Sequence, residues 1–337
     1  MFRIAELETP DEIARFCSLG SLAPAELSLV PGRAADKLLL AYGPSGEAMA
    51  RCGLWHKAGQ VDGRDYDALG FYHAEDFAAG TALLEFACRL LGERGSGWCI
   101  GPLDGNTWRG YRLVSEAMSL PPFFLEPHQP VEWVKHFEAA GFCPFATYHS
   151  SLAEDLDQID AAAANHQQVR VAQTLAGITI RPFRLEAYEQ ELRRVFELTM
   201  ISFRQNLLFT PIDFAEFSAI YAPLRPRVIP ELFLLAERAG TLLGFVFAIP
   251  DYRQPARGAA LDTVVIKSLA VHPAATNAGL GACLVDQCHL AAGRLGFRHA
   301  IHAMMHDDNI SVRISRRTAK VIRRYALFSR KLLSAAP

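Results

Sequence analysis

Two glycines separated by one residue, Gly279 and Gly281, open an amphipathic helical pattern shortly after an apolar, strand-like run that ends at Val271. At such a junction successive backbone N–H groups and the positive end of the helix dipole face one point, which suits a pyrophosphate. Glycine is favoured there because a Cβ would block close approach of the backbone or disfavour a positive φ. A tight loop without a ligand is the alternative, since short Gly-x-Gly pairs are common in turns.

The residues that follow argue against two common phosphate loops. Gly281 is followed by Ala282-Cys283-Leu284, so a Gly-x-Gly-x-x-Gly motif is not completed, and no Gly-Lys-Ser/Thr follows as in a Walker loop. Hydride transfer from a dinucleotide and ATP hydrolysis are therefore not indicated.

The remaining pattern resembles the GNAT acetyltransferase superfamily, whose signature is a strand, then V-x-P, then R/Q-x-x-G-x-G/A at the start of a helix. The stretch here reads Val271-His-Pro273-Ala-Ala-Thr276-Asn-Ala-Gly279-Leu-Gly281. Thr276 stands where Arg or Gln is usual, so it offers a backbone N–H and a hydroxyl but no charge. The resemblance extends from about Ile178 to Leu332 and implies acetyl-coenzyme A (acetyl-CoA) as the cosubstrate.

The same resemblance implies contacts to the cosubstrate. Asn309 would hydrogen-bond the pantetheine arm, while Leu269 and Val271 would offer backbone groups where their strand splays from the next. The Val271 N–H would polarise the thioester carbonyl, an oxyanion-hole role. The full expected binding set is Leu269, Ala270, Val271, Thr276, Asn277, Ala278, Gly279, Leu280, Gly281, Ala282 and Asn309.

In this family an amine attacks the thioester directly, so a proton acceptor is needed but no nucleophilic side chain. The mid-strand carboxylate of some relatives falls at Val265, and the tyrosine that many use as an acid is replaced by Arg316. The expected catalytic candidates are His306, His302 and Glu231. His306 is preferred because it is near its strand end, close to Asn309, and an imidazole titrates near neutral pH. A structural role at a strand end is the alternative for either histidine.

The elements that would hold this site recur along the chain. A strand pattern at Phe2–Leu7 precedes a helix signal, and the same order returns at Ile178–Phe183 and Ala187–Met200. The expected fold class is α+β, with two tandem GNAT-like (acyl-CoA N-acyltransferase) domains, each a mixed, mostly antiparallel sheet flanked by helices. Residues 1–152 would form a degenerate copy, 153–176 a linker helix, and 177–337 the acetyl-CoA-binding domain.

The first copy lacks the glycine pair. Between Gly70 and Gly80, before a helical pattern, Glu75 and Asp76 would place negative charge beside the expected pyrophosphate. We therefore expect that this half has lost its cofactor site. It would serve either as a purely structural half or as a wall of the acceptor pocket, and the sequence favours neither.

Composition narrows the remaining classes. The 337 residues are 50% hydrophobic and 21% charged with a formal net charge of −2, so a nucleic-acid or anionic-membrane partner is not expected. The seven cysteines contain no C-x-x-C pair, so neither a disulfide framework nor a bound metal is expected. No apolar run reaches the roughly 18 residues of a membrane span. We expect a soluble, cytoplasmic protein.

The expected function is transfer of the acetyl group of acetyl-CoA to an amine. The acceptor, a small-molecule or peptide amine, and the oligomeric state are left open by the sequence. Two alternatives remain: a non-catalytic coenzyme-A-binding sensor or interaction module, and a tandem-GNAT acyl or aminoacyl transferase that uses a carrier-bound donor.

Overall fold

The computed structural model describes residues 2–20, 22, 34–118, 120–158 and 161–332. In these residues thirteen strands form one continuous sheet, whose order is β1-β2-β3-β4-β5-β13-β7-β12-β11-β10-β9-β8, with β6 paired to β13. The strands of the first half are β1 Arg3–Glu6, β2 Lys37–Tyr42, β3 Ala48–Val61, β4 Arg64–Ala74, β5 Trp98–Gly101, β6 Leu113–Ala117 and β7 Cys143–Ala153. Those of the second half are β8 Ile178–Pro182, β9 Phe233–Arg238, β10 Thr241–Pro250, β11 Thr263–Val271, β12 His299–His306 and β13 Ala319–Lys331.

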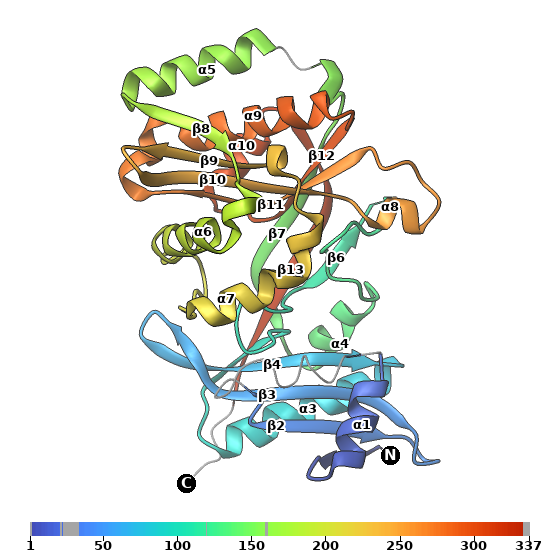
Figure 1. Cartoon of the computed structure of the whole chain (residues 1–337). Helices are drawn as coiled ribbons and strands as arrows, with labels where there is room; N and C mark the ends of the chain where they lie inside the picture. The colour runs from blue at the N-terminus through green and yellow to red at the C-terminus, as the bar shows by residue number, and fades with distance from the viewer. Residues whose placement is uncertain (1, 21, 23–33, 119, 159–160, 333–337) are drawn as a thin grey trace.

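Helices cover both faces of each half. They are α1 Pro10–Ser18, α3 Phe77–Glu93, α4 Trp133–Ala139, α5 Ala161–Thr174, α6 Tyr188–Ser202, α7 Phe214–Tyr221, α8 Arg253–Ala256, α9 Leu280–Arg294 and α10 Ile310–Ser315. The predicted α+β class, with a mixed, mostly antiparallel sheet in each half, is confirmed. Figure 1 shows the two halves stacked, with α5 at the far end of the second half.

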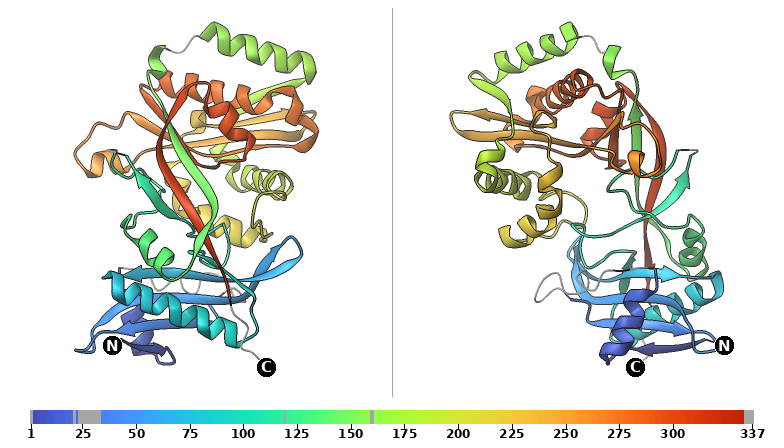
Figure 2. Two further views of the ribbon diagram at one scale, coloured as in Figure 1. Left: turned by 180° about the vertical axis from the view of Figure 1, so that it is seen from behind. Right: turned by 45° about the vertical axis from the view of Figure 1, so that its right-hand side comes forward.

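The halves exchange their closing strands. β7, from the first half of the chain, pairs with β12 of the second, whereas β13, at the end of the chain, pairs with β5 of the first. β7 and β13 also pair with each other along most of their length, from Ala319↔Ala153 to Ser329↔Cys143. Figure 2 shows these two strands running together between the halves. A fragment that starts near Ile178 would lack the neighbour of β12, so we do not expect it to fold alone.

The second half buries a core on each face of its strands. Leu280, Cys283 and Leu284 of α9 are fully buried and pack with Val246 and Ala248 of β10 on one face, within a larger cluster. Leu192, Val195 and Leu198 of α6 pack with Phe245 and Phe247 on the other. The spacing of three or four residues in both helices is what puts these side chains on one stripe. This packing fixes β11, whose end forms the site.

Local signals explain several boundaries. Thr9 and Glu12 form a capping box at the start of α1. The β9–β10 hairpin turns at Ala239 and Gly240, which both have positive φ, of 47° and 81°, as the tightest hairpin turns require. Within the described residues no helix is both long and apolar enough to span a bilayer.

Candidate functional site

The strands β11 and β12 separate halfway along their length. They pair in parallel only from Thr263↔His299 to Ile266↔His302. Beyond that point β12 has an irregular register with β7 between His302 and Met305, and Met304 has a positive φ of 52°. A bulge of this kind bends its strand, so β12 follows β7 while β11 stays with β10. The sheet is therefore open between Lys267 and His306.

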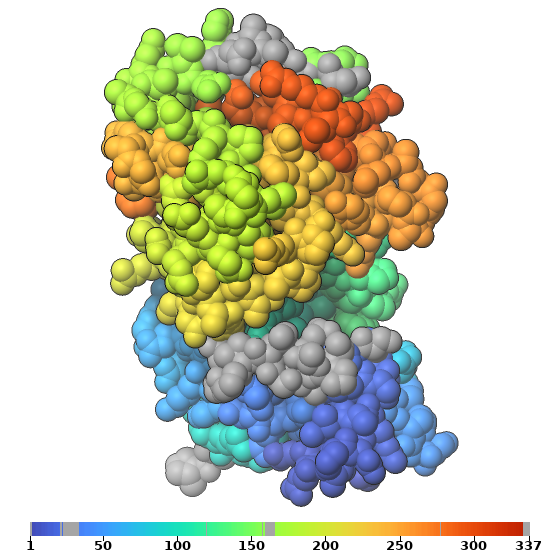
Figure 3. Space-filling view, in the orientation of Figure 1, coloured from blue at the N-terminus to red at the C-terminus, as the bar shows by residue number. Residues whose placement is uncertain are grey.

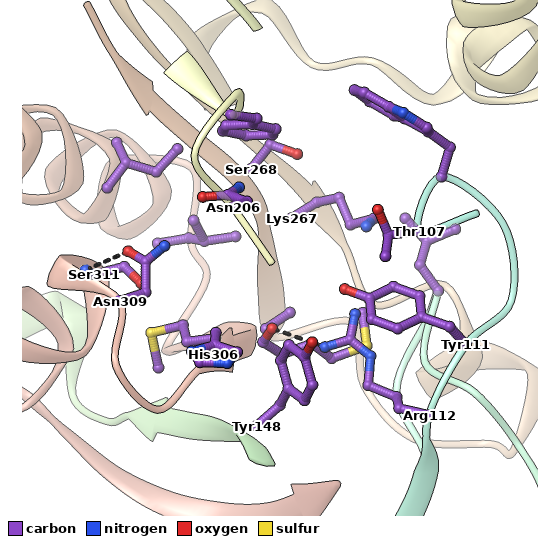
Figure 4. Close-up of a pocket in the computed structure, with 18 of the residues that line it drawn as sticks. Thr107, Tyr111, Arg112, Tyr148, Asn206, Lys267, Ser268, His306, Asn309 and Ser311 are labelled. Atoms are coloured by element: carbon purple, nitrogen blue, oxygen red, sulfur yellow. Dashed lines mark hydrogen bonds between the residues drawn. The ribbon is translucent and has the colours of Figure 1, made fainter. Parts of the chain in front are cut away.

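A cavity of about 950 Å³ lies at this opening. Both halves line it, so the alternative in which the first half walls the pocket is favoured over a purely structural half. The second half contributes the ends of β11 and β12 and parts of α10 and of the loop between α6 and α7. The first half contributes residues 107–112, 125–127 and Tyr148. Figure 4 shows the side chains that converge there, and Figure 3 shows the α6–α7 region (yellow) bordering the first half.

The glycine junction lies directly after β11. Pro273–Ala278 form a 3-10 helix, Gly279 has a φ of 75°, and α9 begins at Leu280 with no side-chain hydrogen bond capping its first turn. A Cβ on Gly281 would approach Ile314 Cδ1 to 3.2 Å, and Ile314 also lines the cavity. The N-cap residue Gly279 has no side chain, so no capping side chain of its own competes for the first N–H groups of α9, which fits a pyrophosphate. Thr276 is exposed, and its hydroxyl donates to the His272 carbonyl at 3.4 Å.

The corresponding place in the first half is closed by the chain itself. β4 and β5 also pair in parallel over only two residues, but the Leu103 N–H donates to the Leu69 carbonyl at 2.7 Å across the gap. A Cβ on Gly70 would meet the Leu103 carbonyl oxygen at 2.4 Å. The Asp76 carboxylate caps α3 by accepting the Ala79 N–H at 2.7 Å. A carboxylate thus occupies the position that an anion would take at this helix.

Two of the expected cofactor contacts line the cavity, Leu269 and Asn309. The Asn309 Oδ1 accepts the Ser311 N–H at 2.9 Å to cap α10, so its amide NH₂ is the group left to donate (Figure 4). The His272 N–H donates to the Leu243 carbonyl of β10 at 2.8 Å. Because backbone groups alternate along a strand, those of Leu269 and Val271 point the other way, toward the opening. Val271 itself is outside the lining, and its carbonyl accepts the Ser202 hydroxyl at 3.1 Å.

Of the three catalytic candidates, His302 and His306 both line the cavity, whereas Glu231 does not. His306 lines the cavity, with its ring 5.0 Å from that of Tyr148, and its Nδ1 accepts the Asp308 N–H at 3.2 Å. The neutral imidazole therefore carries its proton on Nε2. Glu231 is exposed, beside the start of β9, and is not part of the lining.

His302 is 5% exposed, and both of its ring nitrogens are bonded, to His289 Nε2 at 2.9 Å and to the Ser315 hydroxyl at 2.8 Å. Burial, and then the neighbouring His289, hold the pKa of His302 well below its usual range. A neutral, fully bonded imidazole links β12 to α9 and α10 and is poorly placed to take a proton from a substrate.

The cavity also contains residues that the sequence reading did not select. They are Tyr111, Arg112, Tyr148 and Lys267. Lys267 was detectable as the single charged residue within the apolar run Thr263–Val271. Arg112 and the tyrosines carry no local signal, because strand exchange over long sequence distances places them here.

The part of the chain that forms this site is similar in sequence to a known family. Residues 193–314 match the model of the acetyltransferase (GNAT) family, and this segment contains the splayed strands and the glycine junction. "Protein YghO" of Escherichia coli (strain K12) is 22% identical over 217 residues, which cover 59% of this chain and 54% of that protein. The chain thus spans about half the length of this curated relative.

Several solved structures share the fold over nearly the whole chain. A GCN5-related N-acetyltransferase from Sphaerobacter thermophilus has a TM-score of 0.53 at 16% identity and covers 98% of this chain and 96% of its own. A tandem GNAT protein from the clavulanic acid biosynthesis pathway has a TM-score of 0.53 at 13% identity, with 100% and 99% covered. A GCN5-related glucosamine N-acetyltransferase region in a fungal multi-domain protein has a TM-score of 0.57 at 12% identity, with 98% and 38% covered.

These likenesses show the fold. The chain has the fold of these tandem GNAT structures, and its segment 193–314 is similar to the GNAT acetyltransferase family.

Proposed function

We propose that this chain is an N-acetyltransferase that moves the acetyl group of acetyl-CoA directly to an amine. The observation that carries the proposal is the combination of opened strands β11 and β12, a cavity of about 950 Å³ at the opening, and an α9 whose N-cap is a glycine. A phosphate-bearing thioester fits such a site, because its charged end meets the helix and its acyl end reaches the cavity.

The donor would be held by few side chains and many backbone groups. The N–H groups at the start of α9, between Gly279 and Ala282, would bind the pyrophosphate, and the Asn309 amide would donate to the pantetheine arm. Leu269 lines the cavity and directs its backbone toward the opening, whereas Val271 lies outside the lining. We therefore assign the N–H that polarises the thioester carbonyl to Leu269 rather than Val271. We also infer that the first half binds no second donor, because its opening is closed and Asp76 caps α3.

In the reaction the amine nitrogen forms a bond to the carbonyl carbon, the carbon–sulfur bond breaks, and the amine loses a proton while the thiolate gains one. His306 is the ring that faces this space. The sequence suggested that it accepts the amine proton. The tautomer favoured by the Asp308 N–H makes Nε2 a hydrogen-bond donor instead, so we propose that His306 stabilises the departing thiolate by a hydrogen bond while water carries the proton of the amine to the sulfur. Arg316, at the position of the family's usual acid, is exposed and outside the lining.

The test is acetylation of a broad amine library with acetyl-CoA, followed by thiol release and by mass spectrometry of the products. Acetylated product from the wild-type chain, and none from a Gly281→Asp variant that melts normally, supports the proposal. Binding of acetyl-CoA without turnover of any amine would contradict it and would favour the coenzyme-A-binding module.

A further inference from the structure

Arg112 is a buried cation without a carboxylate partner in the part of the chain that the structure describes. It is 7% exposed, and its Nη1 donates to the Met304 carbonyl at 3.1 Å. Its guanidinium carbon lies 3.8 Å from the ring centre of Tyr111 and 4.3 Å from that of Tyr148. The Nε is buried and has no hydrogen-bond partner among the described residues. Such an unpaired donor costs free energy, but Nε is out of reach of a ligand, so the part of the guanidinium that lines the cavity is what an acceptor oxygen would bind.

Lys267 adds a second cation at the same place. It is the first residue of β11 beyond the last pair with β12, and it lines the cavity half-buried. Figure 4 shows its side chain extending toward the side of the cavity where Thr107, Tyr111 and Arg112 lie. Its ammonium has no hydrogen bond or ion pair with any residue described. Burial, and then the charge of Arg112, lower the pKa of Lys267 to about 8.

The other charged groups of the lining do not neutralise this pair. Glu126 accepts the Tyr325 hydroxyl and the Phe123 N–H, and its carboxylate lies 3.2 Å from Arg323 Nε. The Arg109 Nη2 lies 4.0 Å from the Glu216 Oε1. The side chain of Asp308 is exposed to solvent. Two cations with no paired anion therefore face one end of the cavity. A polycationic acceptor would be repelled there, and an anionic group would be attracted.

We propose that the acceptor is an amine that also carries a carboxylate, such as an amino acid, and that Arg112 and Lys267 bind that carboxylate. The proposal rests on the proposed function and adds the substrate class to the same site. The guanidinium is held against two tyrosine rings that meet edge to face, and a fork fixed in this way matches the two oxygens of a carboxylate. Arg112 comes from the first half of the chain and Lys267 from the second, so acceptor recognition requires both halves.

The experiment compares matched acceptors that differ in one charge. The amino acids are offered with acetyl-CoA as free acids and as the corresponding amides, together with polyamines. Ethanolamine phosphate and ethanolamine form a further pair that separates carboxylate from phosphate. We expect kcat/KM at least tenfold higher for one or more free acids than for their amides, mainly through KM. Equal rates for acids and amides, or a preference for polyamines or for the phosphate, would overturn the proposal while acetyl transfer itself stands.

Variants test the residues directly. In Arg112→Gln and in Lys267→Met the preference for acid over amide should fall about tenfold or more, whereas Arg294→Gln, an exposed arginine of α9, should keep it. Lys267→Met keeps the test decisive if Arg112→Gln melts abnormally. If no amine is acetylated, the proposed function fails, and calorimetry of the same acids and amides in the presence of coenzyme A decides the inference alone. Binding of an acid but not of its amide supports it, and no acid binding at millimolar concentration overturns it.

Discussion

Replacing Lys267 by methionine should make the folded protein more stable at neutral pH. The ammonium lies half-buried in the cavity beside Arg112, and the pKa of Lys267 falls from 10.5 to about 8, first through burial and then through that neighbour. Methionine keeps an unbranched apolar side chain of similar length but removes the charge. The cost of holding this cation in the folded state would then disappear.

The size of the effect follows from the pKa. The interval between 10.5 and about 8 corresponds to about 3.5 kcal/mol, at about 1.4 kcal/mol for each pKa unit. Solvent in the open cavity screens part of this, so we expect a gain of about 1–2 kcal/mol at pH 7. Between pH 8 and 10.5 the unfolded chain binds a proton at Lys267 that the folded chain does not, so wild-type stability rises with pH in that window. The advantage of the variant should therefore shrink from pH 8 upward.

Urea unfolding of both proteins from pH 7 to pH 10 measures this difference. Lys320→Met is the control, because Lys320 is exposed on β13, and its change should stay within about 0.5 kcal/mol at every pH. A Lys267→Met variant that is less stable than wild type at pH 7, or whose gain in stability does not fall as the pH rises, would show that the Lys267 cation does not destabilise the folded protein.

Three further outcomes are expected. Gly281→Asp should abolish the rise in melting temperature caused by acetyl-CoA, because it places a side chain in the first turn of α9, against Ile314 of α10. An unchanged rise in melting temperature would mean that the donor binds elsewhere. His306→Ala should lower kcat: a loss that persists at high pH supports stabilisation of the thiolate by a hydrogen bond, recovery at high pH supports acceptance of the amine proton, and wild-type kcat removes His306 from the mechanism. Glu237→Gln should lower the free energy of unfolding by about 1–2 kcal/mol at pH 7, because hydrogen bonds from Arg181 and then Arg194 lower the pKa of Glu237 to about 2. The stabilisation by Glu237 is present above pH 4.5 and should fade as the pH drops toward 2. A loss in urea unfolding that does not depend on pH would argue against this.

The second half was largely predictable from local patterns. The run ending at Val271, the two glycines and the periodic residues from Leu280 correspond to β11, the turn at Gly279 and α9. The hairpin around Gly240 is also detectable from the sequence, because a glycine between two apolar runs is a local signal for a turn. These signals need only neighbouring residues, so one sequence is enough to detect them.

The end of the cavity around Arg112 and Lys267 was not predictable in the same way. Arg112 and Lys267 are far apart in the sequence and meet because β7 and β13 change halves, an event that no local periodicity records. His302 shows the reverse problem, since the sequence offered it as a catalytic candidate, but hydrogen bonds to His289 and Ser315 occupy both of its ring nitrogens. Which polar residue becomes buried depends on packing that the sequence pattern does not reveal.

A structure determined with coenzyme A bound tests directly whether the opening between β11 and β12 binds the donor. We expect the pyrophosphate on the N–H groups between Gly279 and Ala282, the pantetheine arm between β11 and β12 within reach of the Asn309 amide, and the thiol directed into the cavity shared with Arg112. Coenzyme A bound at α3 of the first half, or bound with its thiol outside the cavity between β11 and β12, would contradict it.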